Sequence, residues 1–472
     1  MDRQPSPIYD LFVNFSPIFT APTFENFVWL FCGWLLCLGR RTISRVIQFG
    51  TLYGGQRHHS ILYRFFSRAP WKAGELGDCI FRLVLPLIPQ PREIVFSIDD
   101  TLCRKSGSHI WGAGMHHDPL LSNYGRGSKL VKFFSFGHNW VLLCVCVPAP
   151  WNTDRVIAIP VGFRLYRSKK LCPTSLYQKR TELARELVML AASWVPEERR
   201  IIVVGDNEYA CQTVVRDLQE RVVFIGPMTM DAALYAPPEP SEGRGRPPKK
   251  GKRLLSPQQL IDAQHVHWRS RTLILYGKQV EVLVKTQTCL WYHVAGTRLI
   301  RMIVTRDPKG RIDDRAYFTT DAKMGVDEIA HLFSFRWSQE ELHRNVKQYL
   351  GLEDPQNGWW RRAASKRCDK KVAGPQPHKS RGAAAVQHTV PFILTVYALV
   401  LLWYFRNGDV QQDVERARRR SPWYRHKNEP SFGDMLAAFR RRLWAERIFG
   451  KASKYPGSPK IHQGLEDLLC AA

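Results

Sequence analysis

The chain has 472 residues with 44% hydrophobic content, which is enough to build packed cores and excludes an intrinsically disordered protein. At this length we expect roughly two to four structural units. The 69 Lys and Arg residues outnumber the 42 Asp and Glu residues and give a net charge of +27, which predicts a polyanionic partner without selecting a reaction.

Eleven cysteines are scattered without a C-x2-C pair, so we expect reduced thiols in a cytoplasmic protein. Residues 1–23 lack the pattern of a signal peptide. Cys144 and Cys146 alternate within an apolar strand, which is typical of core residues.

Residues 24–90 predict helices, beginning with the apolar stretch from Phe27 to Leu38, which is too short to span a bilayer. Two short helices then flank a Gly54–Gly55 break. This pattern suits a helix-turn-helix that binds DNA, and it suits an ordinary helical bundle with a basic surface almost equally. The basic residues concerned are Arg40, Arg41, Arg45, Arg57 and Arg64.

Two apolar strand-like segments end in aspartates. EIVFSIDDT leads into Asp99 and Asp100, and RIIVVGDNEYA leads into Asp206. Such runs suit the middle of a sheet that is covered on both faces, where a carboxylate is costly unless it is paired or bound to a cation. Between them, residues 93–167 are strand-rich and residues 175–194 have helical periodicity. This order predicts a mixed α/β sheet.

The cluster of His116, His117 and Asp118 lacks a second half with zinc-ligand spacing, so we expect a polar loop there. Ala236 to Arg253 is rich in Pro, Gly and basic residues. It predicts either a loop that orders on phosphates or a solvated linker, and its candidate DNA contacts are Arg244, Arg246, Lys249 and Lys250.

Beyond that segment, alternating β-prone runs predict a β-rich unit over residues 229–320. Trp268 or Trp291 would stack on an unpaired base if exposed, although core packing is the stronger expectation for each.

The stretch HLFSFRWSQEELHRNVKQYLG, from His331 to Gly351, predicts an amphipathic helix. At about 100° per residue, the face within roughly 60° around its axis carries Phe333, Arg336, Glu340 and Lys347. Taken alone, Arg336 and Glu340 form an i,i+4 pair of the kind that is common on solvated helices. With Asp206 and the Asp99–Asp100 pair upstream, Glu340 instead suggests an all-oxygen pocket for Mg²⁺ or Mn²⁺.

The C-terminal third contains a second basic segment, residues 357–381, for which no role is assigned. The apolar run from Val390 to Phe405 is close to the lower limit of about 17 residues for a membrane span. We expect a buried core helix there, with membrane insertion as the alternative. The basic tail from residue 407 is compatible with DNA contact or with subunit pairing.

The spacing F-x2-R-x3-E-x6-K, followed by KQYLGLEDPQ, is similar to the Y-x2-R-x3-E-x6-K signature of DDE transposases in the bacterial insertion-sequence group with the YREK signature. IDDT and VVGDNEY resemble the two catalytic strands of that group. The segment SPWYRHKNEPSFGDMLAAFRRRLW resembles one branch of it, so that the likeness extends from residue 24 to residue 445.

This resemblance implies a ribonuclease-H-like core in which Asp100, Asp206 and Glu340 hold two divalent ions, Mg²⁺ or Mn²⁺. Asp100 is preferred as the first ligand because it directly precedes Thr101, as the family's aspartate precedes its threonine, and Asp99 is the alternative. Arg336 and Lys347 would contact phosphates beside the scissile bond. The aromatic positions of the signature are Phe333 and Trp337. Phe333 lacks the hydroxyl of the family's tyrosine, which leaves formation of a hairpin intermediate in doubt.

The resemblance also implies an N-terminal helical DNA-binding domain, with Arg45 and Arg57 as candidate contacts, and a β-rich insertion that grips transposon ends. The resulting division is 1–90, the N-terminal domain; 91–228 and 321–406, the two parts of the core; 229–320, the insertion; and 407–472, the basic C-terminal region.

The function implied is cut-and-paste transposition on double-stranded DNA, with cleavage at terminal inverted repeats and joining of the 3′ ends to a target. Relatives act as dimers, so a homodimer on DNA is expected. Two alternatives are a domesticated protein that binds DNA without cutting it and another ribonuclease-H-like nuclease, although the latter does not explain the spacing of Arg336 and Lys347.

Overall fold

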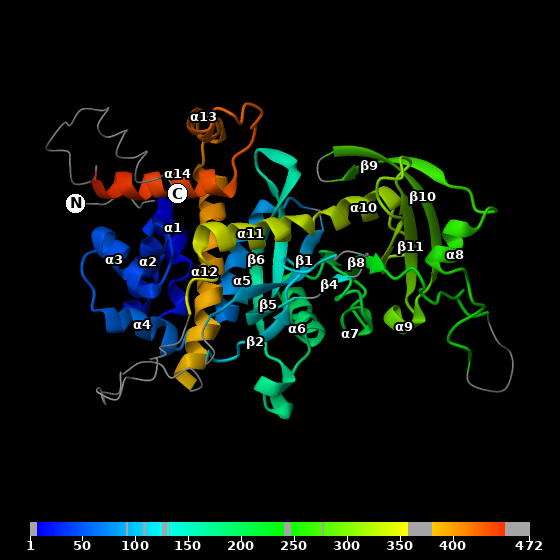
Figure 1. Cartoon of the computed structure of the whole chain (residues 1–472), viewed down its shortest axis with the longest axis horizontal. Helices are drawn as coiled ribbons and strands as arrows, with labels where there is room; N and C mark the ends of the chain where they lie inside the picture. Colours follow the sequence, from blue (N-terminus) through cyan, green and yellow to red (C-terminus); the bar gives the residue numbers. More distant parts are fainter. Residues whose placement is uncertain are drawn as a thin grey trace.

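The computed structural model describes residues 7–90, 93–106, 110–124, 130–131, 133–239, 247–275, 278–356 and 380–448. In this part of the chain, ten strands form one large sheet and a further two form a short hairpin, β3 (Asn123–Tyr124) and β4 (Leu130–Val131). Helices cover both faces of the large sheet and form a separate layer at one end (Figure 1).

Five strands in the centre of the sheet are arranged in the order β6-β5-β1-β7-β8. Their bounds are β1 (Ile94–Arg104), β5 (Phe134–Ala149), β6 (Asn152–Tyr166), β7 (Ile201–Gly205) and β8 (Val222–Met228). β5 runs antiparallel to β1 and β6, whereas β7 lies parallel to both β1 and β8. This mixed α/β arrangement is consistent with a ribonuclease-H-like nuclease fold. β2 (Gly114–His117) pairs with the first residues of β5, on the edge of β5 opposite β1.

Four more strands extend the same sheet beyond β8, in the order β12-β11-β10-β9. Their bounds are β9 (Arg269–Leu275), β10 (Lys278–Leu290), β11 (Leu299–Arg306) and β12 (Arg315–Thr319). β12 pairs antiparallel with β8, so the strands of residues 229–320 continue the central sheet. Two short helices, α8 (Pro257–Asp262) and α9 (Tyr292–Ala295), lie in this part of the chain.

The two faces of the central sheet are covered by different helices. α5 (Ala73–Val84) and α6 (Arg180–Trp194) pack on one face, where Phe81 of α5 stacks on Phe96 of β1 at 5.9 Å between ring centroids. α10 (Val326–Ser334) and α11 (Trp337–Leu350) lie against the other, where Ile329 joins Val95 and Val204 in one apolar cluster. Successive residues of β1 therefore face different helices. The short α7 (Gln212–Val215) follows β7.

The N-terminal helices do not stand apart from the rest of the protein. Their bounds are α1 (Pro7–Val13), α2 (Ala21–Leu36), α3 (Ile43–Gly54) and α4 (His59–Ser67). α12 (Ser380–Asn407) runs between this group and the sheet, and it contacts α1, α4, α5 and β6 (Figure 1). α14 (Phe432–Ile448) packs on α2 and α12, and α13 (Val410–Arg420) packs on α14.

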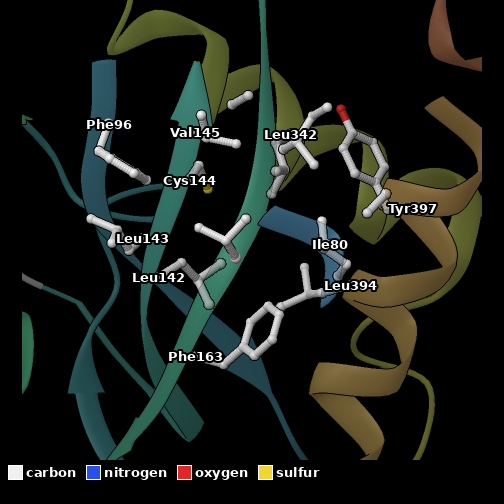
Figure 2. Packing of buried hydrophobic residues seen from close by; sticks show 14 of the residues in the cluster. Ile80, Phe96, Leu142, Leu143, Cys144, Val145, Phe163, Leu342, Leu394 and Tyr397 are labelled. Atoms are coloured by element: carbon white, nitrogen blue, oxygen red, sulfur yellow. The ribbon is translucent and has the colours of Figure 1, made fainter. Parts of the chain in front are cut away.

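Among the described helices, α12 alone is long and apolar enough to cross a membrane. It lies within the protein, however, because 89% of its most apolar window is buried. Leu394 and Tyr397 of this helix face Leu342 of α11 and Phe163 of β6 in the core (Figure 2). The apolar run at 390–405 therefore forms a core helix, and Pro391 lies inside it.

Two local expectations are wrong. The stretch 331–351 forms two helices, because the amides of Phe335, Arg336 and Ser338 each bond the carbonyl three residues earlier and tighten the chain between α10 and α11. His116 and His117 lie in strand β2 rather than in a loop. Asp118, which follows them, bonds Arg104 at 2.7 Å.

Candidate active site

Asp99 and Asp100 point to opposite faces of the sheet. Ser97, which has the same parity as Asp99, lies near Cys146, and Cys146 in turn contacts Ser338 of α11. Phe96, which has the same parity as Asp100, stacks on α5. The structure therefore places Asp99 on the face covered by α10 and α11, and Asp100 on the face covered by α5 and α6.

Arg336 connects Asp99 to Glu340. Its guanidinium lies 2.6 Å from Glu340 Oε1 and 3.7 Å from Asp99 Oδ2. The i,i+4 spacing on the helix therefore forms an ion pair, as the sequence permits, and the same cation also reaches the β1 aspartate. Asp99 and Arg336 are 15% and 22% exposed at their side chains, so this arrangement is largely enclosed.

Asp206 stands directly after β7, which runs parallel to β1, so it lies at the same end of the sheet as Asp99. Its Oδ1 accepts the backbone N–H groups of Glu208 at 2.9 Å and Tyr209 at 3.4 Å. These bonds close the turn that carries the DNEY sequence and fix the carboxylate at the strand end. Val204, two residues earlier, packs in the α10 cluster, so the parity of β7 directs Asp206 to the face of Asp99.

The pKa shifts of Asp99, Asp206 and Arg336 show that these groups interact electrostatically. Burial raises the pKa of Asp99 well above its ordinary range, and the nearby charges of Asp206 and Asp100 raise it further. Burial also raises the pKa of Asp206, and this effect outweighs the hydrogen bond from the backbone N–H of Glu208, which lowers the pKa. Burial alone lowers the pKa of Arg336, but the negative charges of Glu340 and Asp99 outweigh burial and raise this pKa. The site thus holds excess negative charge that a cation stabilises.

Asp100 belongs to a separate network on the other face. Its carboxylate accepts hydrogen bonds from Tyr209 Oη at 3.0 Å, from Arg180 at 3.3 Å and from the side-chain amide of Asn139. Arg180, at the first turn of α6, also pairs with Glu208 at 2.7 Å. Through Tyr209, this network holds the turn that positions Asp206.

These partners of Asp100 were missed by the sequence reasoning. Glu208 and Tyr209 stand in the VVGDNEY motif and were available as a signal, because their spacing from Asp206 is that of an Asx-type turn. Arg180 and Asn139 come from elements far away in sequence, and no local pattern marks them.

His343 is a further residue of the α11 face that the sequence reasoning passed over. It stands three residues after Glu340 and four before Lys347, so the three share one side of the helix. Its Nε2 is enclosed and has no hydrogen-bond partner in the described structure. Burial, and then the charges of Lys347 and Arg336, lower the pKa of His343 to about 3, so its ring is neutral at physiological pH.

The donor set suits a divalent cation, because Asp99, Asp206 and Glu340 supply only carboxylate oxygens, which are the ligands that Mg²⁺ and Mn²⁺ prefer. The raised pKa values of Asp99 and Asp206 reflect burial without enough positive charge. Within the residues that the structure describes, no group of three or more His, Cys, Asp or Glu side chains is arranged so that it could hold a metal ion. The Arg336 guanidinium, which pairs with Asp99 and Glu340, currently supplies the positive charge.

The remaining residues proposed from the sequence as DNA contacts have varied surroundings. Phe333 packs against Tyr317 of β12 at 4.8 Å, whereas Trp337 is 49% exposed. Arg45 is exposed on α3, while Arg57 bonds Asn26 and Glu25 of α2. Arg41, one of the basic residues of the helix-turn-helix expectation, is buried and donates to the carbonyl of Trp34.

In the 236–253 segment, Lys249 is exposed, and the ammonium of Lys250 lies over the Tyr235 ring at 4.2 Å. Arg244 and Arg246 lie outside the described residues, as do residues 357–379 of the second basic segment. Of the two tryptophans considered for base stacking, Trp291 is buried against Phe318 at 5.0 Å. Trp268 lies between the side chains of Arg306 and Lys285, with 4.4 Å from the guanidinium carbon of Arg306 to the ring.

A family model described as "DDE superfamily endonuclease" matches residues 14–282, which is more than half of the chain. The matched range includes α2, α3, α4 and the segments that carry Asp99, Asp100 and Asp206, and it ends before α11. No curated protein matches the chain.

Proposed function

Because the chain belongs to the DDE superfamily of endonucleases, we propose that it is a transposase of the YREK insertion-sequence group. It cleaves DNA at the terminal inverted repeats of a mobile element with two bound Mg²⁺ or Mn²⁺ ions and joins the freed 3′ ends to target DNA. We place this activity in the bacterial cytoplasm, at the nucleoid, and in a homodimer assembled on DNA.

The observation that supports the proposal is that one cation, Arg336, interacts with carboxylates from three segments that lie far apart in the sequence. Asp99 from β1, Asp206 after β7 and Glu340 on α11 all act electrostatically on Arg336. Placing buried acids together is costly for stability alone. A site that binds cations gives these residues a use that offsets the cost.

Bound divalent ions would activate a water or a 3′-hydroxyl for attack on a phosphodiester and stabilise the oxygen that leaves. Asp99, Asp206 and Glu340 would hold them. With the carboxylates bound to metal, Arg336 would be free to pair with a DNA phosphate, and Lys347, further along the same helix face, would contact another. The neutral ring of His343 keeps the space between these two cations free of a third positive charge.

For the first ligand, the arrangement favours Asp99, the alternative in the sequence analysis, over Asp100. Asp99 shares the Arg336 guanidinium with Glu340. Asp100 instead holds the Asp206 turn through Tyr209 from the opposite face. Asp100 then acts as a positioning residue.

The domain division proposed from the sequence assigns DNA-end recognition to two parts of the protein. These are the N-terminal helices, with Arg45 exposed, and the strands β9 to β12 with the neighbouring Lys249 and Lys250. Both carry basic residues, which supports contact with phosphates.

The test is incubation of the full chain with DNA that carries the terminal repeats flanking its gene, with Mg²⁺, with Mn²⁺ and with neither. Asp99→Ala, Asp206→Ala and Glu340→Ala are each expected to reduce cleavage by at least about a thousandfold while retaining DNA binding. Asp100→Asn is expected to retain measurable cleavage and to require more metal.

Two results would redirect the proposal. Loss of cleavage in Asp100→Asn, with activity retained in Asp99→Ala, would return the first ligand to Asp100. Specific binding without cleavage under every metal condition would favour the second candidate, a domesticated DNA-binding protein. The observation that favours this candidate is Phe333, which replaces the tyrosine of the signature.

A further inference from the structure

The loop between α13 and α14, residues 421–430, presents two large aromatic rings to solvent. Trp423 is 74% exposed and Tyr424 is 62% exposed, and their ring centroids are 6.3 Å apart. A largely exposed tryptophan beside an exposed tyrosine is unusual, because their apolar area favours burial by a few kcal/mol. Neither the fold nor the proposed active site uses these rings.

The loop holds the rings outward on a defined scaffold. The amide of Tyr424 bonds the carbonyl of Ser421 at 2.9 Å, and that of Lys427 bonds the carbonyl of Tyr424 at 3.2 Å. Arg418 of α13 donates to the Lys427 carbonyl at 2.9 Å and to Asn428 at 3.0 Å. These two consecutive turns, clamped by an arginine, fix the backbone on both sides of the exposed rings.

The surroundings of the rings are cationic. From Arg416 to Lys427 the chain carries six Lys or Arg residues and no acidic residue. Acidic neighbours neutralise part of this charge, because Asp434 pairs with Lys427 and Arg420, Asp413 with Arg416, and Glu415 with Arg419. Arg425, next to Tyr424, is exposed and has no ion pair in the described structure. Exposed rings within excess positive charge suit a ligand that has both flat apolar faces and negative charge.

The loop is also tied to the region of the active-site helix. Glu429 accepts hydrogen bonds from Asn152 and from Arg155, the latter at 2.9 Å, beside the β5–β6 turn. The same Glu429 lines a cavity of about 410 Å³ together with Trp337 and Glu341 of α11. This cavity therefore lies between the end of the loop and α11, the helix that carries Glu340.

We propose that residues 421–427 form a DNA-contacting element in which Trp423 and Tyr424 stack on unpaired bases while Arg425 contacts a phosphate. This inference rests on the proposed function, because cleavage at an element end creates ends whose bases can leave the duplex stack. Unpaired bases expose the faces that aromatic rings bind, whereas paired bases cover them. A second copy of the chain is a poor occupant, because it too carries a net charge of +27.

The experiment measures the affinity of the full chain for two fluorescently labelled DNAs in EDTA, so that no cleavage occurs. One DNA is a fully paired duplex, and the other is the same duplex with a short single-stranded tail. Trp423→Ala and Tyr424→Ala are each expected to weaken binding of the tailed DNA by about tenfold and binding of the paired duplex by less than about twofold. Trp423→Phe, which keeps a ring, is expected to restore most of the affinity.

Two further variants provide controls. Tyr9→Ala removes an aromatic side chain that is 54% exposed on α1, outside the loop, and is expected to leave both affinities unchanged. Arg425→Ala is expected to weaken both DNAs similarly and to reduce the slope of log affinity against log salt by about 1.

The outcomes separate this inference from the proposed function. If the tryptophan and tyrosine variants bind tailed DNA as tightly as the unaltered protein, the loop proposal is overturned while metal-dependent cleavage stands. The same holds if these variants change the oligomeric state and leave the affinity for both DNAs intact. If the unaltered protein binds neither DNA, the proposed function fails together with the loop.

Discussion

Asp118 illustrates how strongly the ionisation of one residue depends on its hydrogen-bond donors, above all on Arg104. Its carboxylate accepts hydrogen bonds from Nε and Nη2 of Arg104, at 2.7 and 3.0 Å, and from the hydroxyl of Ser135 at 2.6 Å. The bonds from Arg104, against the effect of burial, lower the pKa of Asp118 to about 2. A two-bond pair of this kind contributes more than an isolated surface ion pair.

The pH dependence follows from the sign of that shift. Since the pKa is lower in the folded state than in the unfolded state, the stabilisation is complete above pH about 4 and is lost as the pH falls through about 2. Asp118→Asn is therefore expected to lower the free energy of unfolding by about 1–2 kcal/mol at pH 7, and by less at pH 3. The value is moderated because Arg104 is 39% exposed.

Urea denaturation at both pH values measures this difference. Asp154→Asn, which alters an exposed aspartate outside any ion pair in the described structure, is the matched control and is expected to change stability by less than about 0.5 kcal/mol. A destabilisation by Asp118→Asn that is as large at pH 3 as at pH 7 would contradict the role of the carboxylate charge.

The sequence identified the aspartate pair of β1 but not the different surroundings of its two members. Alternation along a strand means that only one of two neighbours can face α11. Which one does so depends on the side of the sheet that each helix covers, and that is settled by contacts among distant segments, such as Cys146 with Ser338. Local sequence carries no record of those contacts.

At the scale of an element, α5 contains two glycines with opposite surroundings. A Cβ on Gly77 would lie 1.9 Å from the carbonyl oxygen of Val161 in β6, whereas a Cβ on Gly74 would meet no atom within 4 Å. Gly77 thus permits the close approach of α5 to the sheet, while Gly74 is only a weak helix former.

Gly77→Ala is therefore expected to lower the free energy of unfolding by about 1–3 kcal/mol or more, because backbone must move to admit the methyl group. Gly74→Ala is expected to leave stability unchanged or raise it by up to about 1 kcal/mol. Thermal unfolding of both variants checks this. Equal midpoints for the two would show that α5 does not approach β6 as closely as described.

The element that carries Glu340 shows where periodicity succeeds and where it ends. The buried positions Leu342 and Val346 and the polar face of Arg336 and Glu340 follow the predicted period. The tightened turn at Phe335 does not, because no Pro or Gly marks it. Phe335 instead packs against the apolar cluster that contains Ile329 and Leu332 of α10.

At the scale of the whole molecule, the charge of +27 has a measurable consequence. Each DNA phosphate neutralised by a cationic side chain releases counterions, so affinity for any duplex should decrease steeply with salt. If about six to ten phosphates are contacted, affinity is expected to fall by about 10³–10⁵ between 50 and 200 mM salt. Fluorescence anisotropy at several salt concentrations measures the slope. A nearly flat dependence would contradict phosphate contact as the main source of affinity.

The overall architecture was only partly accessible from sequence. The mixed α/β class and the strand-rich part of the core follow from the apolar runs around 94–104 and 134–166. The continuation of the sheet through pairing of β12 with β8 does not, because residues 229–320 read equally well as a sheet of their own. Pairing between strands about 90 residues apart depends on shared burial beneath α10, which a linear pattern does not contain.

The position of α12 between the N-terminal helices and the sheet affects how the protein must be made. The ribosome completes residues 7–67 long before it reaches residue 380, yet α4 and α1 bury part of their apolar surface on α12. During translation those helices have no permanent neighbour for that surface. Their final docking can occur only after most of the polypeptide has emerged, so the first segment synthesised is among the last to reach its native environment.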